Sequence, residues 1–207
     1  MAVSYPLTLP SSPANFRAAR FKLSGNTGMF MSQLSRVQQI SRRAGQLWFA
    51  TFIVPPIVTV ADAAEWKAFL TALRGREGTF RCGDPAYTGP RGTAGGTPLV
   101  NGSHAAGVRS LVTDGWSAAA TFLKGDYFQV GDYLYMVVYA DGTADGSGNM
   151  TITFEPALRV AAADNAPITK SAPKGIWRLA SDDQGEWDEQ IGPVFGFALD
   201  AHEALGQ

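Results

Sequence analysis

Five acidic residues lie around a tryptophan between residues 182 and 189, and paired carboxylates can act as general acid and general base. They are Asp182, Asp183, Glu186, Asp188 and Glu189, with Trp187 among them. A carboxylate pair beside an aromatic ring is typical of sites that cleave or bind sugars. A solvated acidic loop explains the same residues without any substrate. Sugar hydrolysis is therefore one hypothesis, and a solvated acidic loop without catalytic function is the alternative.

Nucleophilic catalysis has weaker support in the sequence. The segment Gly115-Trp116-Ser117-Ala118-Ala119 approaches the G-x-S-x-G elbow, but it lacks the final glycine and the strand-turn-helix context. Cys82 and His104 could form a nucleophile and its base. A small side chain on a half-buried strand is the better explanation of Cys82. We predict that the protein is not an enzyme.

Metal and phosphate sites are also poorly supported. A calcium-loop start is matched at Asp141, Thr143, Asp145 and Gly146. Ile152, however, stands where such a loop needs a bidentate acid. The glycine-rich run 89–96 lacks the G-K-[ST] sequence of a phosphate cradle and precedes no helix. Because the chain has one cysteine and two histidines, soft metal ligands are few. We expect no metal and no cofactor.

Charge and composition narrow the class of protein. Seventeen basic residues oppose eighteen acidic ones, a net charge of −1, which argues against affinity based on many phosphate contacts. Charged residues make up 17%, below the usual value of about 25%, so much of the surface is neutral and suits subunit contacts. The one basic cluster, Arg36, Arg42 and Arg43, suits a salt bridge or an interface. No stretch of about 18 apolar residues occurs, so we expect no membrane insertion.

A single amphipathic helix is predicted over about residues 60–74. Trp66, Phe69, Leu70 and Leu73 recur at the spacing of one helix face. Thr59 is the candidate N-cap, Arg74 lies in the expected last turn and Gly75 at the expected stop. The buried face makes this helix a core element.

The first third of the chain otherwise predicts strands. Residues 1–33, with Pro6, Pro10 and Pro13, indicate an extended arm that could cross onto a neighbouring molecule. Runs 36–42 and 46–54 predict a hairpin around the glycine-containing connection 43–45. The second run is apolar on both faces, so it is sandwiched inside the subunit or between subunits. Trp48, Phe52, Arg42 and Arg43 are the candidate interface residues.

A second β-rich block follows a long, glycine-rich loop at residues 86–107. Gly131-Asp132 predicts a type II′ hairpin between runs 126–130 and 133–139. Residues 150–155 alternate as a half-buried strand. The predicted fold is mainly β with one core helix: a barrel- or sandwich-like domain with a smaller β subdomain inserted. We assign residues 1–88 plus 161–207 to the first unit, and residues 89–160 to the inserted unit with its glycine-rich entry loop.

One segment, residues 66–85, resembles tail proteins of long-tailed bacteriophages. It has the form W-x-A-F-L-x-x-L-R-G-R-x-G-T-F-x-x-G-D-P, carried by Trp66, Phe69, Leu70, Leu73, Arg74, Gly75, Arg76, Gly78, Thr79, Phe80, Gly83, Asp84 and Pro85. Weaker similarities follow in order at 112–116, 125–127, 144–149, 156–159 and 173–175, so the resemblance covers about residues 34–180. Among tail proteins, the chain most resembles the distal tail protein, which joins the tail tube to the tail tip.

The resemblance implies a structural, homo-oligomeric ring, most commonly a hexamer. Its implied partners are further copies of itself, the tail tube, and the tail-tip or hub proteins, and DNA passes through the ring without specific binding. The implied location is the virion tail of a siphovirus-like particle, assembled in the cytoplasm of the bacterial host. Closed rings need heterologous contacts in which one subunit's front meets the next one's back.

A binding module is the alternative from a different class. Tyr127, Tyr133, Tyr135, Tyr139 and Trp116 could line a glycan- or host-surface-binding face of a tail-tip protein. Ordinary sheet packing, with the hydroxyls at the wet edge, explains the tyrosines equally well.

Overall fold

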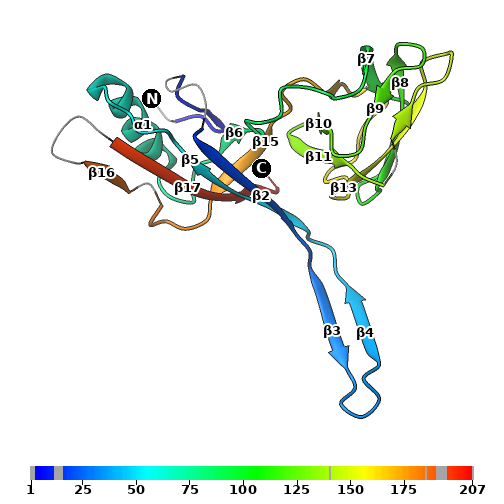
Figure 1. Cartoon of the computed structure of the whole chain (residues 1–207), viewed down its shortest axis with the longest axis horizontal. Helices are drawn as coiled ribbons and strands as arrows, with labels where there is room; N and C mark the ends of the chain where they lie inside the picture. Colours follow the sequence, from blue (N-terminus) through cyan, green and yellow to red (C-terminus); the bar gives the residue numbers. More distant parts are fainter. Residues whose placement is uncertain (1–2, 12–15, 140, 185, 190–194, 207) are drawn as a thin grey trace.

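The computed structural model describes residues 3–11, 16–139, 141–184, 186–189 and 195–206. The protein is mainly β, with one helix in these ranges, as the sequence predicts. A sheet covered by the helix and a barrel-like sheet hold separate hydrophobic cores, and a long hairpin projects away from both (Figure 1). Pro13 of the predicted N-terminal arm lies outside the described ranges.

The first sheet combines strands from distant parts of the chain. Its strands are β1 (Leu7–Thr8), β2 (Ala18–Ser24), β5 (Leu47–Ile53), β6 (Phe80–Cys82), β15 (Gly175–Leu179), β16 (Trp187–Glu189) and β17 (Phe195–Glu203). The order is β1-β6-β15-β17-β5-β2, and β16 pairs with β17 outside this path. Along β17 buried and exposed residues alternate, because successive side chains point to opposite faces of a strand. One face of this sheet therefore belongs to the core and the other to solvent.

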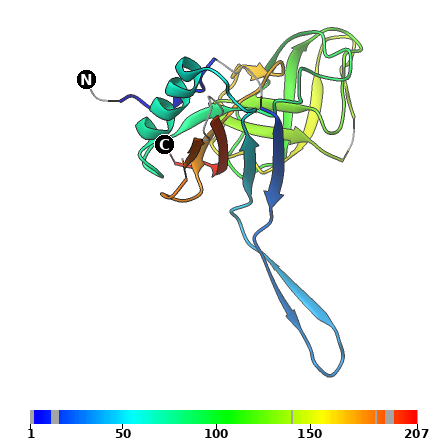
Figure 2. The same ribbon diagram turned by 60° about the vertical axis from the view of Figure 1, so that its left-hand side comes forward.

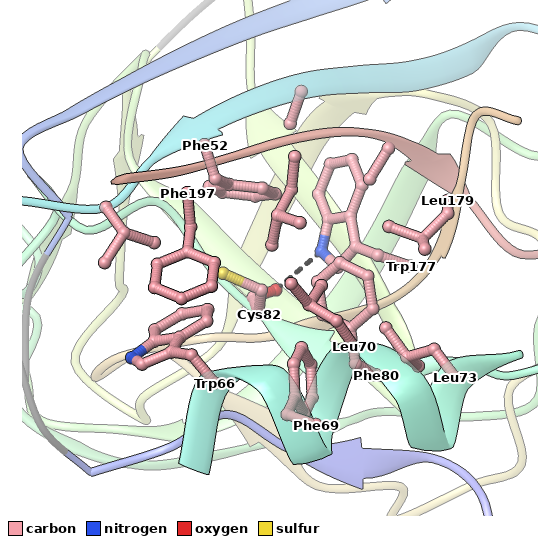
Figure 3. Close-up of a cluster of buried hydrophobic side chains, with 14 of the residues drawn as sticks. Phe52, Trp66, Phe69, Leu70, Leu73, Phe80, Cys82, Trp177, Leu179 and Phe197 are labelled. Atoms are coloured by element: carbon pink, nitrogen blue, oxygen red, sulfur yellow. Dashed lines mark hydrogen bonds between the residues drawn. The ribbon is translucent and has the colours of Figure 1, made fainter. Parts of the chain in front are cut away.

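The helix α1 (Val60–Leu73) covers the buried face of the first sheet. The ring of Trp66 stacks on that of Phe197 of β17 at 6.0 Å, and Phe69 meets Phe80 of β6 edge-on at 5.8 Å (Figure 3). The predicted helix and its buried face are confirmed. Arg74, however, has a left-handed conformation with φ 50° and is the C-cap rather than part of the last turn.

The N-terminus of α1 departs from the predicted capping arrangement. Thr59 occupies the N-cap position, but its side chain makes no hydrogen bond to the helix backbone. Its hydroxyl instead donates to the carboxylate of Asp62. The helix therefore gains its stability from the packed face and not from a side-chain cap.

The hairpin predicted around residues 43–45 is wrong. Strand β4 (Gln38–Arg42) pairs with β3 (Thr27–Met31), whereas β5 pairs with β2. Residues 18–53 thus form one long hairpin whose turn lies at residues 32–37, and residues 43–45 only interrupt it. The interruption is bridged by Asn26, whose carbonyl accepts from the Arg43 N–H at 3.0 Å and whose side-chain amide donates to the Ala44 carbonyl at 2.8 Å.

The second sheet is a nearly closed barrel. Its strands are β7 (Gly96–Val100), β8 (Ser110–Trp116), β10 (Tyr127–Val130), β11 (Tyr133–Val137), β13 (Met150–Glu155) and β14 (Ile168–Thr169), in the order β14-β10-β11-β13-β8-β7. The end strands approach each other where Leu99 forms a bridge with Pro167. Short strands β9 (Thr121–Phe122) and β12 (Gly142–Thr143) pair beside it. The predicted strand 150–155 and the Gly131-Asp132 hairpin are confirmed, with Gly131 at φ 59°.

The second sheet extends further than the sequence predicts at both of its ends. Strand β14 pairs with β10, although residues 161–207 were assigned to the first unit. The loop predicted over 86–107 contains β7, which pairs with β8. Glycine is a poor strand signal, but Gly96 is needed for this pairing because a Cβ there would lie 2.3 Å from the Gly115 carbonyl oxygen.

Truncating the main aromatic side chain of α1 tests the first core. Trp66 is 2% exposed, so Trp66→Ala should lower the free energy of unfolding by about 3–5 kcal/mol through lost burial and the cavity left behind. Urea denaturation followed by circular dichroism measures it. Glu65→Ala, on the exposed face of the same helix, is the matched control and should change stability by less than about 0.5 kcal/mol. Equal effects of the two variants would contradict this packing.

Candidate functional site

The acidic segment does not form a carboxylate pair suited to hydrolysis in the described residues. Asp182 accepts the backbone N–H of Arg76 at 2.9 Å and holds the turn after α1. Asp183 and Glu186 are exposed and line a surface groove together with Arg17. The side chains of residues 188 and 189 lie outside the described part of the structure. What remains is an acidic, solvent-facing rim.

The candidate nucleophiles are not arranged for catalysis. Cys82 is buried in the first core, and its thiol donates to the Gly83 carbonyl at 3.2 Å. His104 lies between β7 and β8, where it forms an isolated bridge with Ala162 outside the strands of the sheet. Ser117 follows β8, and its N–H donates to the Gly95 carbonyl at 3.0 Å. No hydrogen bond joins any two of these side chains within the described ranges.

The calcium-like segment is a self-contained turn. Asp145 Oδ1 accepts the backbone N–H groups of Ser147 and Asn149, each at 2.8 Å. These bonds, first of all the one from Asn149, lower the pKa of the Asp145 carboxyl. No group of three or more His, Cys, Asp or Glu side chains within the described ranges could hold a metal ion.

The tyrosines of the second unit do not form one exposed surface. Tyr135 is 1% exposed, and its hydroxyl accepts the Arg159 backbone N–H at 3.0 Å. Trp116 is buried and donates to the Thr113 hydroxyl at 2.8 Å. Tyr127 packs against Trp48 with its ring centroid at 6.1 Å. Much of the aromatic set proposed for glycan contact therefore packs the interior.

A buried ion pair joins the two units. Arg159, which follows β13, contacts Glu203 at the end of β17 at 2.5 Å, and their side chains are only 9% and 3% exposed. The same guanidinium donates to the Gln46 carbonyl at 2.6 Å. Glu203 also accepts the Trp48 backbone N–H at 3.3 Å. The barrel, the last strand and the base of the projecting hairpin thus meet at one desolvated site.

The predicted interface residues Trp48 and Phe52 are buried within the subunit. Trp48 donates its indole N–H to the Leu134 carbonyl of β11 at 3.1 Å, so it contacts the barrel of its own chain. Phe52 is fully buried in the first core. The prediction that these two side chains contact another subunit is therefore wrong. Only the face of β5 that carries Trp48 and Phe52 is buried in the subunit, whereas Phe49 on the other face is 40% exposed, so the strand is not covered on both faces within one chain.

The segment of residues 66–85 is a packing motif in this fold. Trp66, Phe69, Leu70, Leu73 and Phe80 fill the first core (Figure 3). Its small and polar members shape the turns between and beside these elements; they are Arg74, Gly75, Arg76, Gly78, Thr79, Gly83, Asp84 and Pro85.

Steric crowding explains why two positions of this segment are glycine. A Cβ at Gly78 would lie 2.7 Å from the Leu73 carbonyl oxygen, and one at Gly83 would lie 2.1 Å from the Pro173 carbonyl oxygen. Asp84 accepts the Ala86 N–H at 2.9 Å and closes the following turn. The motif thus specifies how α1 and β6 join the sheet.

The sequence indicates the outer part of the long hairpin only through its basic residues: the predicted interface residues Arg42 and Arg43 lie there and are exposed, but the apolar surface beside them was not predicted. We call residues 25–45, which contain β3 and β4, the arm. It extends away from both cores in two views (Figures 1 and 2). Its large apolar side chains are exposed: Met29 64%, Phe30 70%, Met31 39%, Leu34 99%, Val37 66% and Ile40 61%.

The arm is also positively charged. Arg36, Arg42 and Arg43 lie on it, and residues 1–61 contain six basic residues and no acidic one. The first acid of the chain is Asp62, at the start of α1. This charge segregation was the sequence signal that could have singled out the arm.

Comparison of the chain with protein-family models and with curated proteins finds no match. In the described ranges, no helix is both long and apolar enough to cross a membrane.

Neutralising one partner of the buried ion pair should destabilise the protein strongly. Glu203→Gln leaves the Arg159 guanidinium buried without a counter-charge, so we expect a loss of about 3–5 kcal/mol in the free energy of unfolding. Urea denaturation measures it. Glu77→Gln is the matched control, because both side chains of its pair with Arg74 are 58% exposed and such pairs contribute at most about 1 kcal/mol. Similar small losses in both variants would show that the pair does not join the units.

Cys82 should resist alkylation while the protein is folded. Burial raises the pKa of its thiol from 9.0 to about 12, so at pH 8 the reactive thiolate is about a thousandfold rarer than for an ordinary thiol. Iodoacetamide labelling followed by mass spectrometry should be slow in buffer and fast in urea. Ser103→Cys in a Cys82→Ala background supplies an exposed comparison thiol. Equal labelling rates at the two folded sites would refute the buried state of Cys82.

Proposed function

We propose that this protein is a structural virion component, a distal tail protein whose copies form the ring between tail tube and tail tip of a long-tailed bacteriophage. The observation that carries the proposal is the arm, an apolar and basic hairpin with no core of its own. The similarity of residues 66–85 to phage tail proteins adds the biological setting. Tail tube and tail-tip or hub proteins are the proposed neighbours, and DNA is proposed to pass through the ring without specific binding.

The apolar side chains of the arm call for a partner. Met29 pairs with Ile40 on one face of the ribbon, and Phe30 pairs with Gln39 on the other, so both faces present apolar surface. A two-stranded ribbon cannot bury these side chains in its own interior. Contiguous exposed apolar surface on a folded protein usually marks a contact with another molecule. Burial against a further chain accounts for this arm.

The charge of the arm favours a head-to-tail contact over a contact between two arms. Arg36, Arg42 and Arg43 would face like charges if two arms paired side by side, which is unfavourable. The rest of the chain, from Asp62 onward, carries an excess of acidic residues, eighteen against eleven basic. An arm resting on the body of the next copy is electrostatically favourable, and a repeated head-to-tail contact can close into a ring.

Assembly state tests this proposal directly. Light scattering of the purified protein should give a multiple of the 22.0 kDa subunit mass, six copies being the expected number, and negative-stain images should show rings with an open centre. The triple variant Phe30→Ser, Leu34→Ser, Ile40→Thr should run as a monomer. Its thermal unfolding should stay unchanged, because these side chains lie outside both cores.

A matched variant controls for loss of apolar surface alone. Val112→Ser removes an exposed apolar side chain from the barrel, where Val112 is 41% exposed, and should leave the ring intact. A wild-type protein that stays monomeric at high concentration would refute the proposed function. So would an arm variant that assembles as well as the wild type.

A further inference from the structure

We propose that the arm tip of one copy docks into a specific groove on the next copy. This inference rests on the proposed function and identifies the site that receives the arm. The acceptor groove lies where β5 ends and β17 begins, and its lining includes Ile53, Val54, Phe197, Ala198, Asp183 and Glu186. The occupant is the arm of a second copy of this chain, led by Leu34 and Arg36.

The groove and the arm lie at opposite ends of the same strand pair. At one end, Ile53 of β5 pairs with Ala18 and with Ala198, and this end borders the groove. At the other end Ser24 pairs with Leu47, and the chain continues into the arm. These ends are about 20 Å apart at about 3.3 Å per residue. The arm points onward from its own end, so it cannot reach the groove of its own chain (Figure 1).

This placement produces a head-to-tail contact. The arm extends about 30 Å from Gly25 to Leu34 at about 3.3 Å per residue, long enough to cross onto an adjacent molecule. A donor at one end and an acceptor at the other make a heterologous interface, in which every copy gives one arm and receives one. Where the rotation between neighbours closes, such contacts form a ring in which no arm is left unpaired.

The chemistry of the groove complements the arm. Asp183 and Glu186 are exposed at its rim, and neither forms a salt bridge with another residue of the described ranges. One cation, Arg17, lies in the described lining. Pro56 and Ala198 supply exposed apolar surface beside the carboxylates. The groove therefore offers an apolar seat for Leu34 and an acidic edge for Arg36.

A second groove on the molecule does not match the arm. It lies beside Leu9 and Asp84, and its lining includes Arg81 and Lys174. These cations would oppose the basic arm, and Arg81 already pairs with Asp132 at 2.7 Å. Charge therefore selects the groove beside β17 as the acceptor.

Cross-linking between copies tests the site. One variant carries Leu34→Cys and the other Ala198→Cys, and both retain the buried Cys82. After mild oxidation, the mixture should give a covalent dimer, whereas each variant alone should give little. Replacing Ala198→Cys by Val112→Cys, on the exposed face of the barrel, should abolish the cross-link. Light scattering before oxidation checks that each variant still assembles.

A charge exchange provides the second measurement. Arg36→Glu should weaken assembly at least tenfold, and so should Glu186→Arg, whereas the double variant should recover most of the loss. Sedimentation across a concentration series gives the dissociation constants. If the wild-type protein forms rings but the cysteine variants give no Leu34–Ala198 cross-link, the acceptor site is wrong while the proposed function stands. The same holds if the wild type forms rings but the double charge variant recovers no assembly. A monomeric wild-type protein would overturn both.

Discussion

The arrangement of the whole molecule depends on the buried contact between Arg159 and Glu203. Removing both charges from water is costly, and the pair is stable only where each group finds its further partners. The guanidinium donates to the Gln46 carbonyl, and the carboxylate accepts the Trp48 N–H. Trp48 lies in β5 and Gln46 directly precedes that strand, where the chain comes back from the arm. The orientation of the barrel, the last strand of the first sheet and the base of the arm are thus set together.

Local sequence signals predicted the elements that local interactions stabilise. The spacing of Trp66, Phe69 and Leu73 predicted α1, and Gly131 predicted the hairpin between β10 and β11, because a positive φ is needed there. The long hairpin was missed since its turn carries no glycine. Arg36 takes the left-handed conformation with φ 58°, while Gly45 lies in an interruption that resembles a turn. Only the pairing of β2 with β5 reveals this, and that pairing spans about 30 residues.

The candidate site was predicted less well than the fold. Met29, Phe30 and Ile40 are typical strand residues. The sequence alone does not reveal that they are exposed and not packed against a core. The sequence does show that residues 1–61 are basic and free of acids, but charge alone does not indicate an exposed apolar ribbon. The proposed acceptor groove combines residues 53–54, 183–184, 186 and 196–198, which only the sheet topology brings together. Residues that suggested chemistry, such as Asp145 and Cys82, proved to serve turns and packing.

The position of β17 in the first sheet has a consequence for the order of folding during synthesis. This strand lies between β5 and β15, so the sheet has no continuous ladder until residues 195–203 have been made. The barrel strands all lie between Gly96 and Thr169, so the barrel can close on contacts nearer in sequence. Because Phe197 and Ala198 also line the proposed acceptor groove, an unfinished chain would carry an arm but no place to receive one. Incomplete subunits would then be left out of the proposed ring.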